Sequence, residues 1–122
     1  MARAVAISYQ LVIEVPTVVR CVVGRLGEVE FPAGEYVYTG SARRTLESRI
    51  ARHRRPSKKL RWHIDYLLAA PGVRITRIVR SRREECALNK ATAGQLVVPG
   101  FGASDCNSGC GGHLKHLAGP GG

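Results

Sequence analysis

The first forty residues are rich in β-branched and other hydrophobic side chains, and proline and glycine interrupt them at intervals. Short hydrophobic runs between turn residues are typical of β-strands. The first run stops at Pro16, and the runs on either side of residues 24–27 indicate a hairpin. We therefore expect four strands, over residues 5–15, 18–23, 28–31 and 35–39.

The pattern changes after residue 40, where helix signals replace strand signals. Ser41 is a suitable N-cap for a helix that ends near Arg54, and Ser57 is suitable for a second helix that ends before Pro71. The sequence predicts the remaining elements as a second helix over residues 58–70, a strand over 73–80, a third helix over 82–93 and a short strand or turn over 112–117.

Strands that come first, with helices interleaved later, predict an α+β fold, in which a small antiparallel β-sheet is flanked by about three helices. A chain of 122 residues forms one domain and can bury a core without disulfides. We expect this domain to cover residues 1–117, followed by a frayed tail over residues 118–122.

The first predicted helix carries ionisable residues close to its hydrophobic face. At about 100° per residue, Leu46, Ile50 and His53 share one face, and Arg49 lies at its edge. Since Leu46 and Ile50 must face the sheet, His53 points to the interior. An ionisable group beside the core costs free energy unless it is paired or used. Arg49 and His53 are therefore either paired structural residues or parts of a functional site.

The second predicted helix carries the only tryptophan of the chain. Trp62, Asp65 and Tyr66 fall on one side of that helix, and His63 lies beside them. We expect Trp62 to anchor the helix and the polar side chains to make hydrogen bonds, in preference to a catalytic role.

The chain is strongly basic, with 19 Lys and Arg against 9 Asp and Glu and a formal net charge of +10. Such an excess attracts polyanions, of which nucleic acid is the usual one. No stretch approaches the ~20 apolar residues of a membrane span, and residues 1–10 lack the apolar run of a signal peptide. We therefore expect a cytoplasmic protein without a membrane partner, whose four cysteines are packed, ligating or reactive thiols.

Positive side chains crowd the end of the first predicted helix and the start of the second, where only Glu47 dilutes them. We expect these side chains to contact phosphates without reading the base sequence, and a solvated charged face is the alternative. This set, the basic patch, comprises Arg43, Arg44, Arg52, Arg54, Arg55, Lys58, Lys59 and Arg61. Five further arginines would extend it, namely Arg74, Arg77, Arg80, Arg82 and Arg83.

Six short motifs follow one another along the chain. They are GEYVYTGSA at 34–42, RIARH at 49–53, WHIDYL at 62–67, EC at 85–86, GFGASDC at 100–106 and HL at 113–114. In this order they resemble the GIY-YIG nuclease superfamily, in particular its small stand-alone Uri-type endonuclease branch, over residues 9–117. The resemblance implies a divalent-metal-dependent endonuclease that hydrolyses phosphodiester bonds in DNA.

The resemblance also implies roles for individual residues. Tyr9 and Tyr38 would meet on adjacent strands, and either could be the general base. Arg49 would clamp the phosphate, and His53 would orient the phosphate or accept a proton. Glu85 would hold a single Mg²⁺ or Mn²⁺ ion. Relatives that are joined to a repair glycosylase of the endonuclease III type imply a role in DNA repair and association with a base-excision repair glycosylase.

Gly40 and Ser41 stand between the fourth predicted strand and the first predicted helix. A glycine at this point lets the backbone approach a ligand closely. We therefore place Gly40 and Ser41 with the nucleic-acid contacts, and an ordinary turn is the alternative for Gly40.

The chain departs from the superfamily pattern in its first and last motifs. Ile7-Ser8-Tyr9 lacks the glycine and isoleucine of the first motif, and the asparagine that many members carry after the metal-binding glutamate has no clear counterpart. The hairpin over residues 18–31 explains the long spacing between Tyr9 and Tyr38. These departures keep a second hypothesis open, a nucleic-acid-binding module that has the same fold and no longer cleaves.

Cys106, Cys110 and His113 form the only cluster of metal-ligand residue types near the end of the chain. Structural zinc needs four ligands, and Cys86 or His116 could supply the fourth. The spacing matches no common zinc motif, so packed or reduced thiols are the favoured interpretation and a structural zinc site is the alternative.

Overall fold

The computed structural model describes residues 6–41, 45–55, 59–60, 62–96, 98, 101 and 112–118. Its elements follow the order β1 (Ser8–Val15), β2 (Val19–Val22), a short 3₁₀ turn (Gly24–Leu26), β3 (Glu28–Phe31), β4 (Gly34–Ser41), α1 (Leu46–Arg54), α2 (His63–Leu68), β5 (Arg74–Ser81), α3 (Glu85–Ala91) and β6 (Leu114–Ala118). The predicted α+β class, an antiparallel sheet with three helices, is confirmed.

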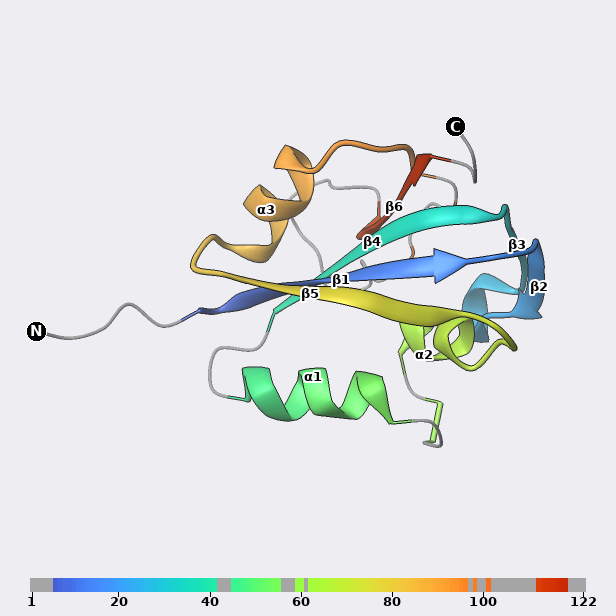
Figure 1. The fold of residues 1–122 in the computed structure, drawn as a ribbon, viewed down its shortest axis with the longest axis horizontal. Coiled ribbons are helices and arrows are strands. Elements are labelled where there is room, and N and C mark those ends of the chain that lie inside the picture. The colour runs from blue at the N-terminus through green and yellow to red at the C-terminus, as the bar shows by residue number, and fades with distance from the viewer. Residues whose placement is uncertain are drawn as a thin grey trace, which may run out of the picture.

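Four strands form the main sheet in the order β5-β1-β4-β6, and every neighbouring pair is antiparallel. The central pair joins β1 to β4, so that Tyr9 lies opposite Gly40 and Leu11 lies opposite Tyr38. Figure 1 shows α1 and α2 on one face of this sheet and α3 on the other. The sheet is therefore the middle layer between helices.

The core lies on the face that α1 and α2 cover. Alternate residues of β1 point to this face because side chains in a strand have a period of two, and Tyr9, Leu11, Ile13 and Val15 are all buried. Tyr36 and Tyr38, two residues apart on β4, join them. Helix α1 contributes Leu46, Ile50 and His53, which are buried as the helical period predicted.

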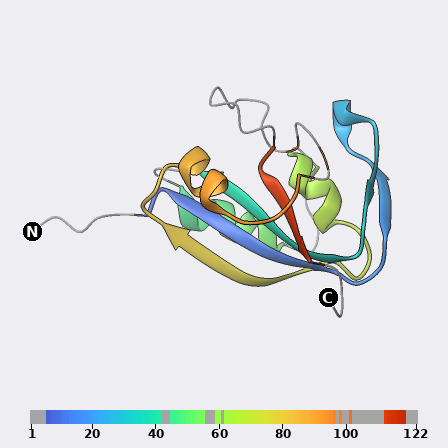
Figure 2. The same cartoon turned by 90° about the horizontal axis from the view of Figure 1, so that it is seen from above.

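Strands β2 and β3 pair antiparallel in a separate two-stranded sheet, and the predicted hairpin is confirmed. Figure 2 shows this hairpin extending from one end of the main sheet. Phe31 at its base and Val23 beside its turn both belong to the core, where they are fully buried. The hairpin thus separates β1 from β4 in sequence without separating them in the sheet.

The helices are shorter than the sequence predicted. Ser41 is the last residue of β4 and does not cap α1, whose N-cap is Thr45. Helix α2 begins only after Trp62, because the Asp65 carboxylate accepts the backbone N–H of Trp62 at 2.9 Å and holds that residue in an extended N-cap conformation. Ser57, which was expected to cap this helix, lies outside the described residues.

Helix α1 ends just before a proline, Pro56. Its C-cap Arg55 has an extended backbone with φ −67° and ψ 132°, the conformation favoured before a proline.

The segment over residues 112–117, for which the sequence left a strand or a turn open, contains strand β6. Ala118 belongs to this strand and not to a tail. The remaining tail residues 119–122 lie outside the described part of the chain.

Among the described residues, no helix is long and apolar enough to cross a membrane.

Candidate functional site

A tyrosine and a histidine meet between the sheet and α1. The phenolic oxygen of Tyr9 and Nε2 of His53 are 2.7 Å apart, which is a hydrogen bond between two buried side chains. The ring of Tyr38 lies 6.4 Å from that of Tyr9 and 6.0 Å from that of His53, measured between centroids. The two tyrosines lie on adjacent strands, as expected, and Tyr9 is hydrogen-bonded to His53.

Gly40 makes room for Tyr9. It lies inside β4, directly opposite Tyr9, and not in a turn after the strand as the sequence suggested. A Cβ atom on residue 40 would come within 2.5 Å of the phenolic oxygen of Tyr9, a distance that real side chains do not reach. The glycine therefore allows the Tyr9 ring to cross the backbone of β4.

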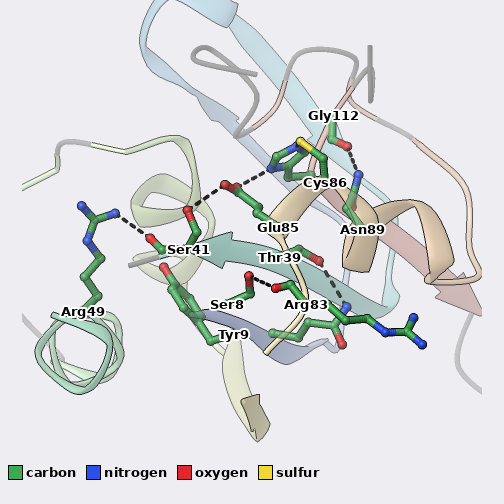
Figure 3. A network of polar contacts seen from close by, with 12 residues as sticks. Ser8, Tyr9, Thr39, Ser41, Arg49, Arg83, Glu85, Cys86, Asn89 and Gly112 are labelled. Atoms are coloured by element: carbon green, nitrogen blue, oxygen red, sulfur yellow. Dashed lines mark hydrogen bonds and ion pairs between the residues drawn. The ribbon is translucent and has the colours of Figure 1, made fainter. Parts of the chain in front are cut away.

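Three polar contacts join residues at the same end of the sheet in a connected row, which Figure 3 shows. Nη1 of Arg49 donates to the backbone carbonyl of Ser41 at 3.0 Å. The hydroxyl of Ser41 donates to Oε1 of Glu85 at 2.9 Å. Oε2 of Glu85 lies 2.6 Å from Nδ1 of His113. Ser41 thus links the arginine of α1 to the carboxylate at the start of α3.

The five residues that the resemblance named are brought to one end of the sheet. Tyr9 and Tyr38 come from the central strands, His53 and Arg49 from α1, and Glu85 from the first turn of α3. Figure 3 shows the Tyr9 phenol directed toward Ser41, next to the row that joins Arg49 and Glu85. Residues scattered over more than seventy positions of the sequence therefore share one region of the molecule.

Burial controls the ionisation of the tyrosines. It raises the pKa of Tyr9, and the positive charge of Arg49 offsets only part of that rise. Burial likewise raises the pKa of Tyr38. Both phenols are therefore neutral near pH 7 unless another positive charge lies beside them. A tyrosine that acts as general base here must release its own proton as it accepts one, because a stable phenolate does not form.

Glu85 has the opposite tendency. Burial by itself would raise the pKa of Glu85, but the hydrogen bonds from His113 and Ser41, with the charges of His113 and Arg49, outweigh it and hold the pKa below its usual range. The side chain keeps 26% of its surface exposed. Glu85 is therefore an accessible carboxylate that is charged at neutral pH.

A single carboxylate of this kind fits Mg²⁺ or Mn²⁺. These ions take oxygen ligands and keep several waters, so they need one or two carboxylates and no complete protein cage. Each oxygen of Glu85 accepts one hydrogen bond and retains further lone-pair capacity. The part of the chain that the structure describes contains no group of three or more His, Cys, Asp or Glu side chains suited to a metal.

Arg52 differs from the other described members of the basic patch. Its guanidinium donates twice to the Asp65 carboxylate, at 2.9 Å each, and lies 4.2 Å from the centre of the Trp62 ring. Asp65 is fully buried. Arg52 therefore has a structural role. The same contacts agree with the expectation that Trp62 anchors the helix and that Asp65 makes hydrogen bonds.

The other described members of the basic patch are exposed on α1 and after it, namely Arg54, Arg55 and Lys59. Arg43, Arg44, Lys58 and Arg61 lie outside the described residues. Of the arginines that would extend the patch, Arg80 is paired with Glu47 at 2.7 Å and Arg74 with Glu14 at 3.3 Å.

The zinc alternative stays a prediction, because its two cysteines, Cys106 and Cys110, lie outside the described residues. His113, the third candidate ligand, is buried and directs its Nδ1 to Glu85, with its Nε2 3.9 Å from the sulfur of Cys86. In the sequence His113 stands near the cysteines, and no local pattern links it to Glu85. Their contact depends on tertiary structure, in which His113 is hydrogen-bonded to Thr39 of β4 and Glu85 is hydrogen-bonded to Ser41 of the same strand.

The comparisons with known proteins give one match. The family described as "Domain of unknown function DUF123" matches residues 8–120. No curated protein and no solved structure matches the chain. Because the matched segment covers nearly all of the sequence and the whole of the fold described above, the chain belongs to the DUF123 family.

Proposed function

We propose that this protein is a divalent-metal-dependent endonuclease of the GIY-YIG type that hydrolyses phosphodiester bonds in DNA. The observation that carries the proposal is the linkage of Arg49 to Glu85 through Ser41, beside the hydrogen-bonded pair of Tyr9 and His53. In this proposal Arg49 is the cation that binds phosphate and Glu85 is the carboxylate that binds the metal ion. Tyr9 is a phenol that is hydrogen-bonded to a base, His53. Together they supply what hydrolysis of a phosphodiester requires.

The pair of Tyr9 and His53 gives a path for the proton of the attacking water. Tyr9 would take that proton on its phenolic oxygen and pass its own to Nε2 of His53 over the 2.7 Å hydrogen bond. A stable phenolate is then not required, in agreement with the raised pKa of Tyr9. This favours Tyr9 over Tyr38 as the residue that contacts the water.

Arg49 would bind the non-bridging phosphate oxygens. Its guanidinium carries five N–H donors, and the bond to the Ser41 carbonyl uses one of them. Glu85 would hold one Mg²⁺ or Mn²⁺ ion, which supplies charge neutralisation at the phosphate and the leaving oxygen when it is bound. Arg49 and Glu85 would thus flank the same phosphate.

The charge of the chain supports a polyanionic substrate. The formal net charge is +10, and Arg54, Arg55 and Lys59 present exposed positive charge on and after the helix that carries Arg49. DNA repair, with a base-excision repair glycosylase as partner, is the setting that the superfamily resemblance suggests, and the cytoplasm is the location that we propose.

A second candidate function is a binding module that no longer cleaves. Two observations favour it: Tyr9 and Tyr38 are 2% and 8% exposed, and both oxygens of Glu85 already accept hydrogen bonds. In such a module the same cations would bind the backbone of nucleic acid, and Glu85 would serve only to order the site.

Nicking of DNA separates the two functions. Supercoiled plasmid and branched oligonucleotides are incubated with Mg²⁺ and the wild-type protein, Glu85→Gln or Tyr9→Phe. For the endonuclease, Glu85→Gln abolishes nicking, and Tyr9→Phe slows it by ~10²–10⁴-fold, the usual contribution of a general base.

Glu84→Gln is the matched control, because Glu84 is the exposed neighbour of Glu85 and loses the same charge. It should nick like the wild type. If the wild-type protein leaves every substrate intact and still binds DNA in a salt-sensitive way, the endonuclease is excluded and the binding module stands.

A further inference from the structure

The position of Glu85 depends on a histidine that the proposed reaction does not use. Glu85 is the first residue of α3, where a long carboxylate side chain has several rotamers. Metal affinity depends on keeping such a ligand in one orientation. The structure supplies one hydrogen-bond donor to each of its oxygens, the Ser41 hydroxyl on Oε1 and the His113 imidazole on Oε2.

His113 is held by its burial and by its backbone hydrogen bonds. Its side chain is 2% exposed. Its backbone N–H donates to the Phe101 carbonyl at 2.7 Å, and its carbonyl accepts the Thr39 N–H at 2.9 Å. The preceding residue is also fixed, because Nδ2 of Asn89 donates to the carbonyl of Gly112 at 2.9 Å. The backbone that carries the imidazole is therefore fixed in position.

The two ring nitrogens of His113 face different partners. Nδ1 is 2.6 Å from the Glu85 carboxylate, which can only accept, so Nδ1 carries the hydrogen. Nε2 faces the sulfur of Cys86 at 3.9 Å. The ring thus lies between the Cys86 sulfur and the Glu85 carboxylate. Rotation of the ring by 180° would break the 2.6 Å contact between Nδ1 and Glu85.

We propose that His113 is a positioning residue that holds the Glu85 carboxylate in its metal-binding orientation. The inference rests on the proposed function, since it assigns a support to the proposed metal ligand. It gives a reason for the burial of His113, and it separates His113 from the zinc alternative, in which the same imidazole would be a ligand itself.

Two amide variants of His113 test the proposal. In His113→Asn the side-chain amide can occupy the place of Nδ1 and still donate to Glu85. In His113→Gln the amide reaches the place of Nε2, and the donor to Glu85 is lost. Binding of Mn²⁺ to the purified full chain is measured by electron paramagnetic resonance, without DNA and without a cleavage assay.

We expect His113→Gln to raise the Kd for Mn²⁺ by about tenfold or more, as is usual when the support of a metal ligand is removed. His113→Asn should bind Mn²⁺ close to the wild-type value. Equal affinity of His113→Gln and the wild type would overturn the inference, and so would weak binding by both amide variants to the same degree.

Two further measurements keep the outcome unambiguous. Glu85→Gln must lose the Mn²⁺ site; if it binds like the wild type, the metal role of Glu85 fails, and the proposed function fails with it. Should the histidine variants not fold, ¹⁵N spectra of the wild-type imidazoles decide. Mg²⁺ is expected to shift the His113 resonances and not those of His116, and an unchanged His113 spectrum overturns the inference.

Discussion

The phenol of Tyr9 crosses the backbone of β4 at Gly40, and this contact decides where the Tyr9 oxygen can lie. A methyl group on residue 40 would meet the phenolic oxygen at 2.5 Å and the adjoining ring carbon at 2.6 Å. Since the ring is buried against His53, it has no open space to move into. Tyr9 can therefore take this position only because residue 40 is a glycine. This holds whether or not Gly40 also contacts nucleic acid.

We predict that Gly40→Ala destabilises the fold by about 1–3 kcal/mol, the usual cost of overpacking a core. It should also reduce any DNA nicking, because the phenol must leave its hydrogen bond with His53. Denaturant unfolding measures the first effect. The double variant Gly40→Ala with Tyr9→Ala removes the clash, so its loss of stability should be smaller than the sum of the two single losses. Additive losses would contradict the proposed contact.

At the residue scale, the motifs of the sequence predict the main candidate site residues but not the contacts that support them. Tyr9, Tyr38, Arg49, His53 and Glu85 were named from motifs, and the fold brings them to one end of the sheet. Ser41 and His113 were named for other reasons, and their contacts with Glu85 were not foreseen. Both contacts join segments that are distant in sequence and depend on the packing of α3 beside β4, which no local pattern contains.

At the scale of elements, the strands were easier to predict than the ends of the helices. A strand is marked by its own hydrophobic pattern, and β1, β3 and β5 lie within about two residues of their expected ends wherever a turn residue bounds them. The helices α2 and α3 begin later than expected. Asp65 fixes the start of α2, and Ser81 delays α3 by accepting the backbone N–H of Arg83 at 3.1 Å.

Helices α1 and α2 are joined by a buried ion pair. Arg52 from α1 and Asp65 from α2 have side chains that are 18% and 0% exposed, and Trp62 packs against the guanidinium. Loss of the arginine leaves the Asp65 charge buried without its main counter-ion, which is costly in a low-dielectric interior. This pair holds the helix that carries Arg49 and His53 against the rest of the core.

We predict that Arg52→Ala lowers the free energy of unfolding by about 3 kcal/mol or more. Arg80→Ala is the matched control, because Arg80 pairs with Glu47 of the same helix but both side chains are exposed, so that water screens the loss. It should unfold at nearly the wild-type denaturant concentration. Equal destabilisation by the two variants would show that the buried pair has no special importance.

At the scale of the whole molecule, excess positive charge is spread unevenly over the elements. The hairpin of β2 and β3 balances its charges, since Arg20 pairs with Glu30 at 2.7 Å on an exposed surface. The end of α1 and the residues that follow it carry Arg54, Arg55 and Lys59. Nucleic acid that reaches Arg49 along α1 would therefore contact these cations and not the hairpin.

This distribution predicts different salt dependences for two variants that each remove one positive charge. Binding of a short DNA duplex is followed by fluorescence anisotropy over a series of salt concentrations. Arg54→Ala should reduce the slope of log Kd against log salt by about 0.9, the contribution of one phosphate contact on duplex DNA. Arg20→Ala should leave the slope unchanged, because Arg20 lies on the hairpin and is already paired. A similar change in both slopes would mean that DNA responds only to the net charge, and the basic patch would then not be its binding surface.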